Sequence, residues 1–218
     1  TLAGIRQAAS LGYKAVEFDV MFSRDGTPVL IQDETLERTS NGFGPVSETP
    51  DSLLFSLDAG AGEPIPRFVE AAALCRELGL LANIEIKPAR AYELTTAQRV
   101  AELTARLWSD APVPPLISSF SLAALDVARQ VAPQIRRGIL FEAVPAKWLS
   151  EMRRLQASTL HCKANQLSDA VLAEALAHDI PVLCYTVNSV KQAKNLLERG
   201  VTAMFSDRLD LFAGEAAL

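Results

Sequence analysis

Cysteine and histidine are scarce in this sequence. Its 218 residues include three cysteines and two histidines. The cysteines, Cys75, Cys162 and Cys184, are far apart and form no CxxC pair, which excludes the usual zinc and dithiol redox motifs. Each lies in an apolar segment, so we expect three buried thiols that behave as small hydrophobic residues. Unpaired thiols are typical of a reducing compartment, and we expect a cytoplasmic protein.

Long apolar runs and an excess of positive charge are also lacking. No segment approaches the roughly 18 consecutive apolar residues of a membrane-spanning helix, and no signal peptide is visible at Thr1. Lysine and arginine number 21 against 26 acidic residues, which gives a net charge of −5. This balance argues against a nucleic-acid partner, because binding to a phosphate backbone requires a basic face. It is compatible with a small phosphate ester held by a metal or by one basic side chain.

The remaining composition is that of a folded chain with a substantial core. The hydrophobic fraction is 49%, with 12 prolines and 11 glycines, which excludes disordered and collagen-like classes. No linker rich in glycine, serine or proline divides the chain, so we expect a single domain over residues 1–218. Residues 33–63 are polar and irregular, and we expect a small insertion there, since long excursions in compact domains are usually functional or mobile.

Strand-like and helix-like segments alternate along most of the sequence. A turn at Asp25-Gly26 and a short return over residues 28–32 predict a hairpin. Apart from that return, seven strands of the parallel type are predicted to begin near residues 16, 81, 116, 137, 159, 181 and 203. Parallel strands require helical crossovers, so the pattern predicts the α/β class.

Seven such units are one short of the eight that close a (β/α)₈ TIM barrel. The chain opens with a helix over residues 1–11 that has no strand before it. We therefore expect the first barrel strand to lie upstream of Thr1 and the insertion to follow the second strand of the barrel. An open doubly wound sheet is the alternative, although the GxGxxG and P-loop motifs that would support it are missing.

Acidic residues alternate with apolar ones on two of the predicted strands. Glu17 and Asp19 share one face of their strand, and Glu85 and Lys87 share one face of the next parallel strand. Carboxylates that converge inside a barrel repel one another and lose solvation. A divalent cation, Mg²⁺ or Ca²⁺, would relieve both costs. An internal network of Glu–Lys salt bridges is the alternative.

Several of these segments together resemble the glycerophosphodiester phosphodiesterase family. The most specific match runs from Glu17 to Gly42, and it is followed by NIEIKP, SSFS, VLCYTVN and GVTAMFSDR. The resemblance covers essentially the whole chain. It implies a TIM barrel with a small insertion after the second strand. It also implies metal-dependent hydrolysis of glycerophosphodiesters to glycerol 3-phosphate and an alcohol, with a small-molecule substrate.

The resemblance also implies roles for individual residues. Glu17, Asp19 and Glu85 match the metal-binding carboxylates of the family. Positions that match its phosphate lysine and its substrate mouth are Lys87, Phe120 and Tyr185, the last of which is Trp in many members. Positions that match the loop after its His-Asp pair are Asp33, Asn41 and Gly42.

Two departures from the family pattern bear on catalysis. The His-Arg-Gly motif of the family would precede Thr1, and Gln32 stands where the second catalytic histidine is expected. Glutamine forms hydrogen bonds but cannot exchange a proton near neutral pH, and a positioned acid–base group is worth about 10²–10⁴-fold in rate. The alternative function is therefore an impaired barrel that binds a metal and a phosphate ester. A phosphoinositide phospholipase-type barrel is a third reading, but the apolar residues show a core-like period and no membrane-facing rim.

Neither histidine in the sequence substitutes for the missing one. His178 lies late on a predicted helix, which favours a cap or surface position. His161 lies on the strand predicted over residues 159–164, where a core position is favoured and a place at the substrate mouth stays open. The sequence leaves the head group, the choice between Mg²⁺ and Ca²⁺ and the oligomeric state undetermined.

Overall fold

A computed structural model describes residues 1–89, 92–112 and 114–213. Within them, one curled sheet runs in the order β2-β1-β3-β4-β5-β6-β7-β8. Seven of the strands are parallel, and β2 pairs antiparallel with the end of β1. The strands are β1 (Ala15–Phe22), β2 (Pro28–Leu30), β3 (Leu81–Ile86), β4 (Leu116–Ser119), β5 (Arg136–Phe141), β6 (Thr159–Lys163), β7 (Val182–Tyr185) and β8 (Ala203–Met204).

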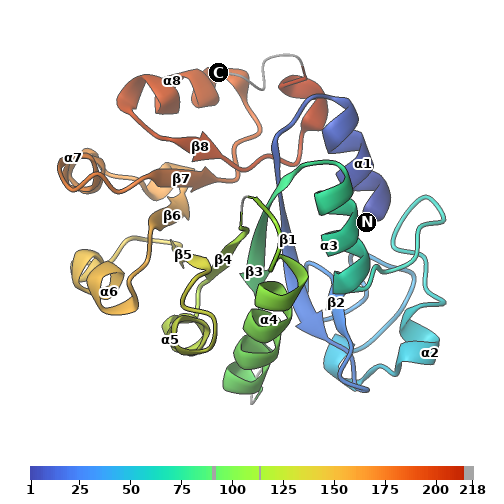
Figure 1. Cartoon of the computed structure of the whole chain (residues 1–218). Helices are drawn as coiled ribbons and strands as arrows, with labels where there is room; N and C mark the ends of the chain where they lie inside the picture. Colours follow the sequence, from blue (N-terminus) through green and yellow to red (C-terminus); the bar gives the residue numbers. More distant parts are fainter. Residues whose placement is uncertain (90–91, 113, 214–218) are drawn as a thin grey trace.

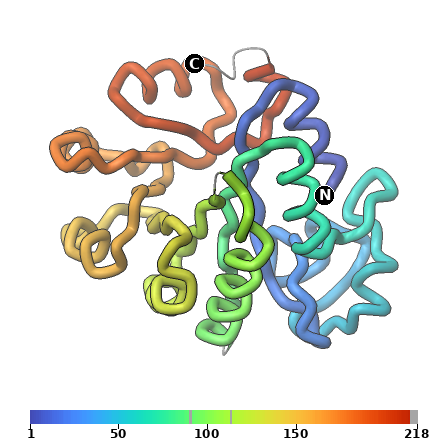
Figure 2. The backbone as a smooth tube through the Cα atoms, viewed as in Figure 1, coloured from blue at the N-terminus to red at the C-terminus, as the bar shows by residue number. Residues whose placement is uncertain are grey.

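The helices follow the strands around the outside of the sheet (Figure 1). The smooth trace in Figure 2 shows the chain passing around the barrel from β1 to β8 in one direction. A doubly wound sheet would carry helices on both faces, so the predicted barrel architecture is confirmed. The helices are α1 (Leu2–Ser10), α2 (Asp51–Leu54), α3 (Phe68–Glu77), α4 (Glu93–Leu107), α5 (Leu122–Val131), α6 (Trp148–Leu155), α7 (Asp169–Ala177) and α8 (Val190–Arg199), with short 3₁₀ turns η1 (Val46–Glu48), η2 (Ala164–Gln166) and η3 (Leu209–Leu211).

Helix ends follow the capping residues in the sequence. Ser121, Ser168 and Ser189 each accept a hydrogen bond from the backbone N–H three residues on, which satisfies one of the unpaired donors of a helix N-terminus. Gly79 and Gly200 follow α3 and α8 with φ of 67° and 104°, a conformation that glycine adopts without steric cost. The seven parallel strands begin within one residue of their predicted positions.

The alternation of side chains along the strands separates two environments. Ile84 pairs in register with Ile117, and Ile139 with Leu160; these four side chains are fully buried in the core between sheet and helices. The intervening positions face the barrel interior. On β1 and β3 those positions carry Glu17, Asp19, Asn83 and Glu85, so the interior is polar on that side and the outer face of the sheet supplies the apolar core.

One expectation about a less regular segment needs correction. Residues 33–63 were expected to be irregular, but they contain η1 and α2 and have a second apolar cluster with Leu36, Val46 and Leu54 at its centre. At the C-terminal end of the described residues the chain forms η3. Residues 214–218 lie outside the described part of the chain.

The sheet has a gap where a barrel would close. Across residues 1–89, 92–112 and 114–213, no ladder joins β8 to β1. A hydrogen bond joins residues near the two ends of the chain: the Tyr13 hydroxyl donates to the Leu209 carbonyl at 2.9 Å. None of the described helices is long and apolar enough to cross a membrane.

Candidate active site

Three carboxylates converge on the inner face of β1 and β3. Asp19 and Glu85 are register partners across the two strands, and Glu17 lies two residues before Asp19 on the same face. One oxygen from each of the three lies within 4.8 Å of the others. Asp19 and Glu85 are buried, whereas Glu17 keeps contact with solvent. The convergence predicted from alternation is therefore present in the structure.

The crowding of these groups disfavours their charged forms. Desolvation raises the pKa of Asp19 to about 6, against the opposing effect of the Lys87 ammonium. Desolvation, followed by the charge of Asp19, raises the pKa of Glu85 to about 8. The pKa of Glu17 is also raised, first by desolvation and then by the charges of Asp19 and Glu85; most of its surroundings are protein although one side meets solvent. Such a set is stabilised by a cation.

The donor set fits a divalent metal with oxygen ligands. Asp19 Oδ1 is buried and accepts no hydrogen bond from the described residues, although the Lys87 ammonium lies 3.6 Å from it. Three carboxylates within bonding range of one point provide the hard oxygen ligands that Mg²⁺ and Ca²⁺ prefer. Sulfur or imidazole ligands, which would favour zinc or copper, are not among the three residues of the cluster.

Lys87 places a positive charge beside this cluster. Its Nζ lies 3.6 Å from Asp19 Oδ1 and donates a hydrogen bond to the Gln32 backbone carbonyl. The loop after β2 and the end of β3 are joined through this contact. The Gln32 side chain is exposed, and the backbone carbonyl of the same residue fixes the lysine.

Two aromatic residues meet at the carboxyl end of the barrel. Phe120 directly follows β4 and Tyr185 ends β7. Their rings contact edge to face with centroids 5.9 Å apart, and the Tyr185 hydroxyl donates to the Phe141 carbonyl at 2.9 Å. The pair bridges strands that are three positions apart in the sheet, and Phe120 remains 44% exposed. The structure thus brings together the two residues expected at the mouth.

The other loop residues have local structural partners. Asp33 accepts a hydrogen bond from Arg38 Nη2 at 2.8 Å, and Asn41 Oδ1 accepts the Asp58 backbone N–H at 2.9 Å. A Cβ on Gly42 would lie 2.5 Å from a Leu57 methyl carbon. These contacts shape the insertion, and none of them reaches the carboxylates.

Neither histidine is a member of the carboxylate cluster. His161 is fully buried on β6 with its Nε2 2.9 Å from Thr159 Oγ1, and desolvation lowers its pKa to about 3. It is therefore a neutral core residue, as the alternation favoured. His178 is exposed at the end of α7.

Asn83 is a polar residue of the site region that the sequence reasoning missed. It is buried, pairs in register with Glu17 and shares the inner face of β3 with Glu85. The available signal was its position two residues before Glu85, which places both side chains on the same face of a strand.

Comparisons with known proteins point to one family. A profile of the glycerophosphoryl diester phosphodiesterase family matches residues 1–211. A glycerophosphodiester phosphodiesterase of Caldanaerobacter subterraneus subsp. tengcongensis is 27% identical over 220 residues, covering 95% of this chain and 87% of the relative. Human glycerophosphodiester phosphodiesterase 1 is 36% identical over 106 residues, which are 44% of this chain and 32% of that protein.

Solved structures give the same result. An Oleispira antarctica phosphodiesterase in complex with the product sn-glycerol-3-phosphate aligns with a TM-score of 0.92 and 32% identity, covering 100% of this chain and 90% of that one. A glycerophosphodiester phosphodiesterase from Agrobacterium tumefaciens aligns with a TM-score of 0.80 and 25% identity over 98% of this chain and 92% of that one. With the family profile matched over nearly the whole length, the chain belongs to the glycerophosphoryl diester phosphodiesterase family.

Proposed function

We propose that this chain hydrolyses glycerophosphodiesters to glycerol 3-phosphate and an alcohol, with Mg²⁺ or Ca²⁺ bound by Glu17, Asp19 and Glu85. The observation that carries the proposal is the convergence of these three carboxylates beside Lys87. The Oleispira antarctica relative, whose structure contains sn-glycerol-3-phosphate, supports the product class. The three cysteines are free and buried, which suits the reducing cytoplasm that we propose as the compartment.

In this proposal the residues of the site have separate roles in the reaction. A bound divalent ion supplies Lewis-acid polarisation of a phosphoryl oxygen. Lys87, whose ammonium is already fixed by Asp19 and by the Gln32 carbonyl, neutralises charge that develops on the phosphoryl oxygens. Phe120 and Tyr185 form an aromatic wall at the mouth and bind the substrate there.

Proton transfer is the step of the reaction that this arrangement of residues supports least. The Gln32 side chain donates a hydrogen bond to an oxygen, but its amide does not exchange a proton near neutral pH. Neither histidine of the chain is a member of the carboxylate cluster, and burial keeps His161 neutral by lowering its pKa to about 3. This observation favours a second candidate function, a barrel that binds the metal and a phosphate ester with little turnover.

The test is release of glycerol 3-phosphate from a panel of glycerophosphodiesters, with Mg²⁺, with Ca²⁺ and with chelator. The unmodified chain, Gln32→His and Gln32→Asn are compared. We expect Gln32→His to be faster than the unmodified chain by about 10²–10⁴-fold, since it restores a group that titrates near neutral pH. Gln32→Asn is the matched control and should give no increase.

The outcomes separate the two candidate functions. Metal-dependent release by the unmodified chain supports the enzyme. Release by Gln32→His alone supports the barrel that binds without turnover. If no variant releases product although the protein is folded, or if release is equal with chelator, the proposed metal-dependent hydrolysis is wrong.

A further inference from the structure

Several polar atoms inside the barrel have no partner. Both ends of the Asn83 amide, Ser118 Oγ and His161 Nδ1 are buried and form no hydrogen bond with any described residue. They come from β3, β4 and β6. A buried polar group without a hydrogen bond costs about 1–3 kcal/mol, and such groups in folded proteins are normally satisfied by ordered water.

The strand register places these atoms in one region next to the carboxylates. Asn83 pairs with Glu17, and Ser118 pairs with Glu85. Side chains of register partners point to the same face of a sheet. Asn83 and Ser118 therefore flank the acidic cluster on the interior side, one beside each of two carboxylates.

Gly138 extends this region to His161. Gly138 is the register partner of Ser118 on β5, and a Cβ at this position would lie 2.6 Å from His161 Nε2. The space without a side chain is thus occupied by the imidazole. Since Nε2 is engaged by Thr159 Oγ1 at 2.9 Å, Nδ1 is the ring atom that remains without a partner.

We propose that the barrel interior beside the carboxylates is a hydrated chamber lined by Asn83, Ser118 and His161, and that Asn83 is a positioning residue for the metal-binding carboxylates. The inference rests on the proposed function. The Asn83 amide offers two donors and one acceptor. It holds Glu17 and Glu85 in place through ordered water, while it touches neither metal nor substrate. Replacing a residue that holds a metal ligand in place typically changes the metal affinity 10–100-fold.

The first test compares Asn83→Leu with Thr104→Val in metal titration calorimetry with Mg²⁺ and Ca²⁺. Both substitutions remove a buried polar group that has no partner, but Thr104 lies on α4, outside the sheet. We expect Asn83→Leu to weaken metal binding 10–100-fold and Thr104→Val to leave it unchanged. Thermal unfolding of both variants without metal shows whether either substitution destabilises the fold itself. Equal metal affinity in Asn83→Leu and the unmodified chain, with or without a loss of unfolding temperature, would overturn the proposal.

A second measurement does not depend on a folded variant or on metal. A high-resolution crystal structure of the unmodified protein should show ordered waters within hydrogen-bond distance of Asn83, Ser118 and His161 Nδ1. A dry interior would overturn the chamber even if the protein hydrolyses its substrate. If the unmodified protein binds no divalent metal, the metal site of the proposed function and the role of Asn83 are both wrong. Metal binding that is indifferent to Asn83 contradicts the further inference alone.

Discussion

At the scale of single residues, the interior histidine shows how burial sets chemistry. His161 is fully buried on β6 and packs against Phe205 with ring centroids 5.4 Å apart. Loss of solvation disfavours its charged form, so its pKa falls to about 3 from an ordinary value of 6.5. A residue type usually associated with acid–base work is thereby kept neutral at any pH at which the protein is expected to act.

This burial predicts a pH dependence of stability. Below pH 6.5 the unfolded chain binds a proton at His161 that the folded protein takes up only near pH 3. The stability from this residue is therefore complete above about pH 6.5 and is lost as the pH falls toward 3, with a slope approaching about 1.4 kcal/mol per pH unit. Urea unfolding at about pH 4.5, 5.5 and 6.5 measures this effect. The free energy of unfolding should depend less steeply on pH in His161→Gln than in the unmodified protein.

The matched control for this prediction is His178→Gln, because His178 is exposed at the end of α7. It should leave the pH dependence as it is in the unmodified protein. Parallel curves for His161→Gln and the unmodified protein would show that His161 takes no part in acid destabilisation.

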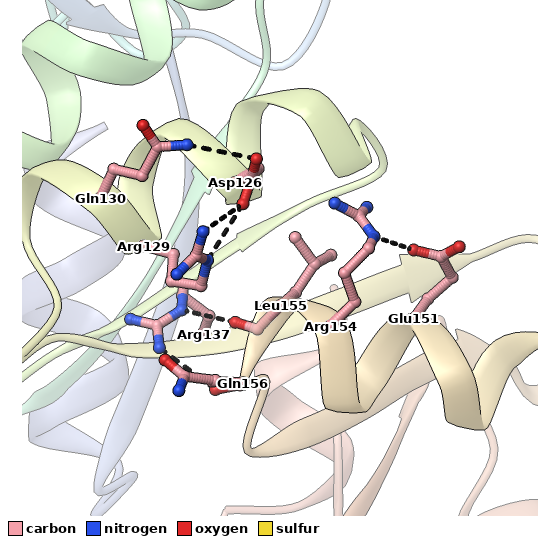
Figure 3. A network of polar contacts seen from close by, with 8 residues as sticks. All are labelled: Asp126, Arg129, Gln130, Arg137, Glu151, Arg154, Leu155 and Gln156. Carbon is pink, nitrogen blue, oxygen red and sulfur yellow. Dashed lines mark hydrogen bonds and ion pairs between the residues drawn. The ribbon is translucent and has the colours of Figure 1, made fainter.

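At the scale of elements, a buried arginine joins β5 to the end of α6. Arg137 is only 4% exposed. Its guanidinium donates to the carbonyls of Leu155 and Gln156, both at 3.1 Å (Figure 3), and to that of Ile135 at 2.6 Å. The last carbonyls of a helix have no partner within it. Arg137 therefore caps α6 from the neighbouring strand and offsets the loss of its own solvation through several charge-assisted hydrogen bonds.

We expect Arg137→Met to lower the free energy of unfolding by about 2–3 kcal/mol, because it keeps much of the apolar stem and leaves the carbonyls unpaired. Arg154→Met on α6 is the control. Its side chain is paired with Glu151 at 2.7 Å near the surface (Figure 3), and the change should stay within about 0.5 kcal/mol. Urea denaturation measures both, and equal losses would refute the capping role.

At the scale of the whole molecule, the carboxylate site is a source of instability that a bound cation would relieve. Glu17, Asp19 and Glu85 come from two adjacent strands and lie within 4.8 Å of one another, and β1 stands beside the gap in the sheet. An ion bound to all three fixes β1 to β3 at the edge of that gap. A ligand that binds only the folded state stabilises it in proportion to the logarithm of its concentration.

Added Mg²⁺ or Ca²⁺ should therefore raise the unfolding temperature, with a stabilisation of about 2.7 kcal/mol at a concentration 100 times the dissociation constant. Glu85→Gln should abolish this shift. Without metal it should be about as stable as the unmodified protein near neutral pH, because the raised pKa of Glu85 already keeps that carboxyl largely uncharged. Differential scanning calorimetry over a metal series measures both. A shift of normal size in Glu85→Gln would exclude Glu85 from the metal site.

Local patterns in the sequence were enough for much of this fold. The alternation of strand-like and helix-like segments predicted the starts of the seven parallel strands within one residue, because such patterns are local to each segment. Alternation along residues 15–22 and 81–87 predicted which carboxylates share a face. The sequence predicted the structure of residues 33–63 less well. The short helix α2 depends on the packing of Leu36, Val46 and Leu54 into a cluster, and no local periodicity of the sequence indicates that packing.

By itself, the sequence determined the α/β class, the family and the acidic residues of the site, because periodicity and motifs are properties of short segments. The tertiary structure alone decided what those residues meet. Register between β1 and β3 placed Asn83 beside Glu17, and register between β4 and β5 left the space at Gly138 that His161 fills. Contacts of this kind join positions tens of residues apart, and they exist only once the strands have paired and the interior has closed around them.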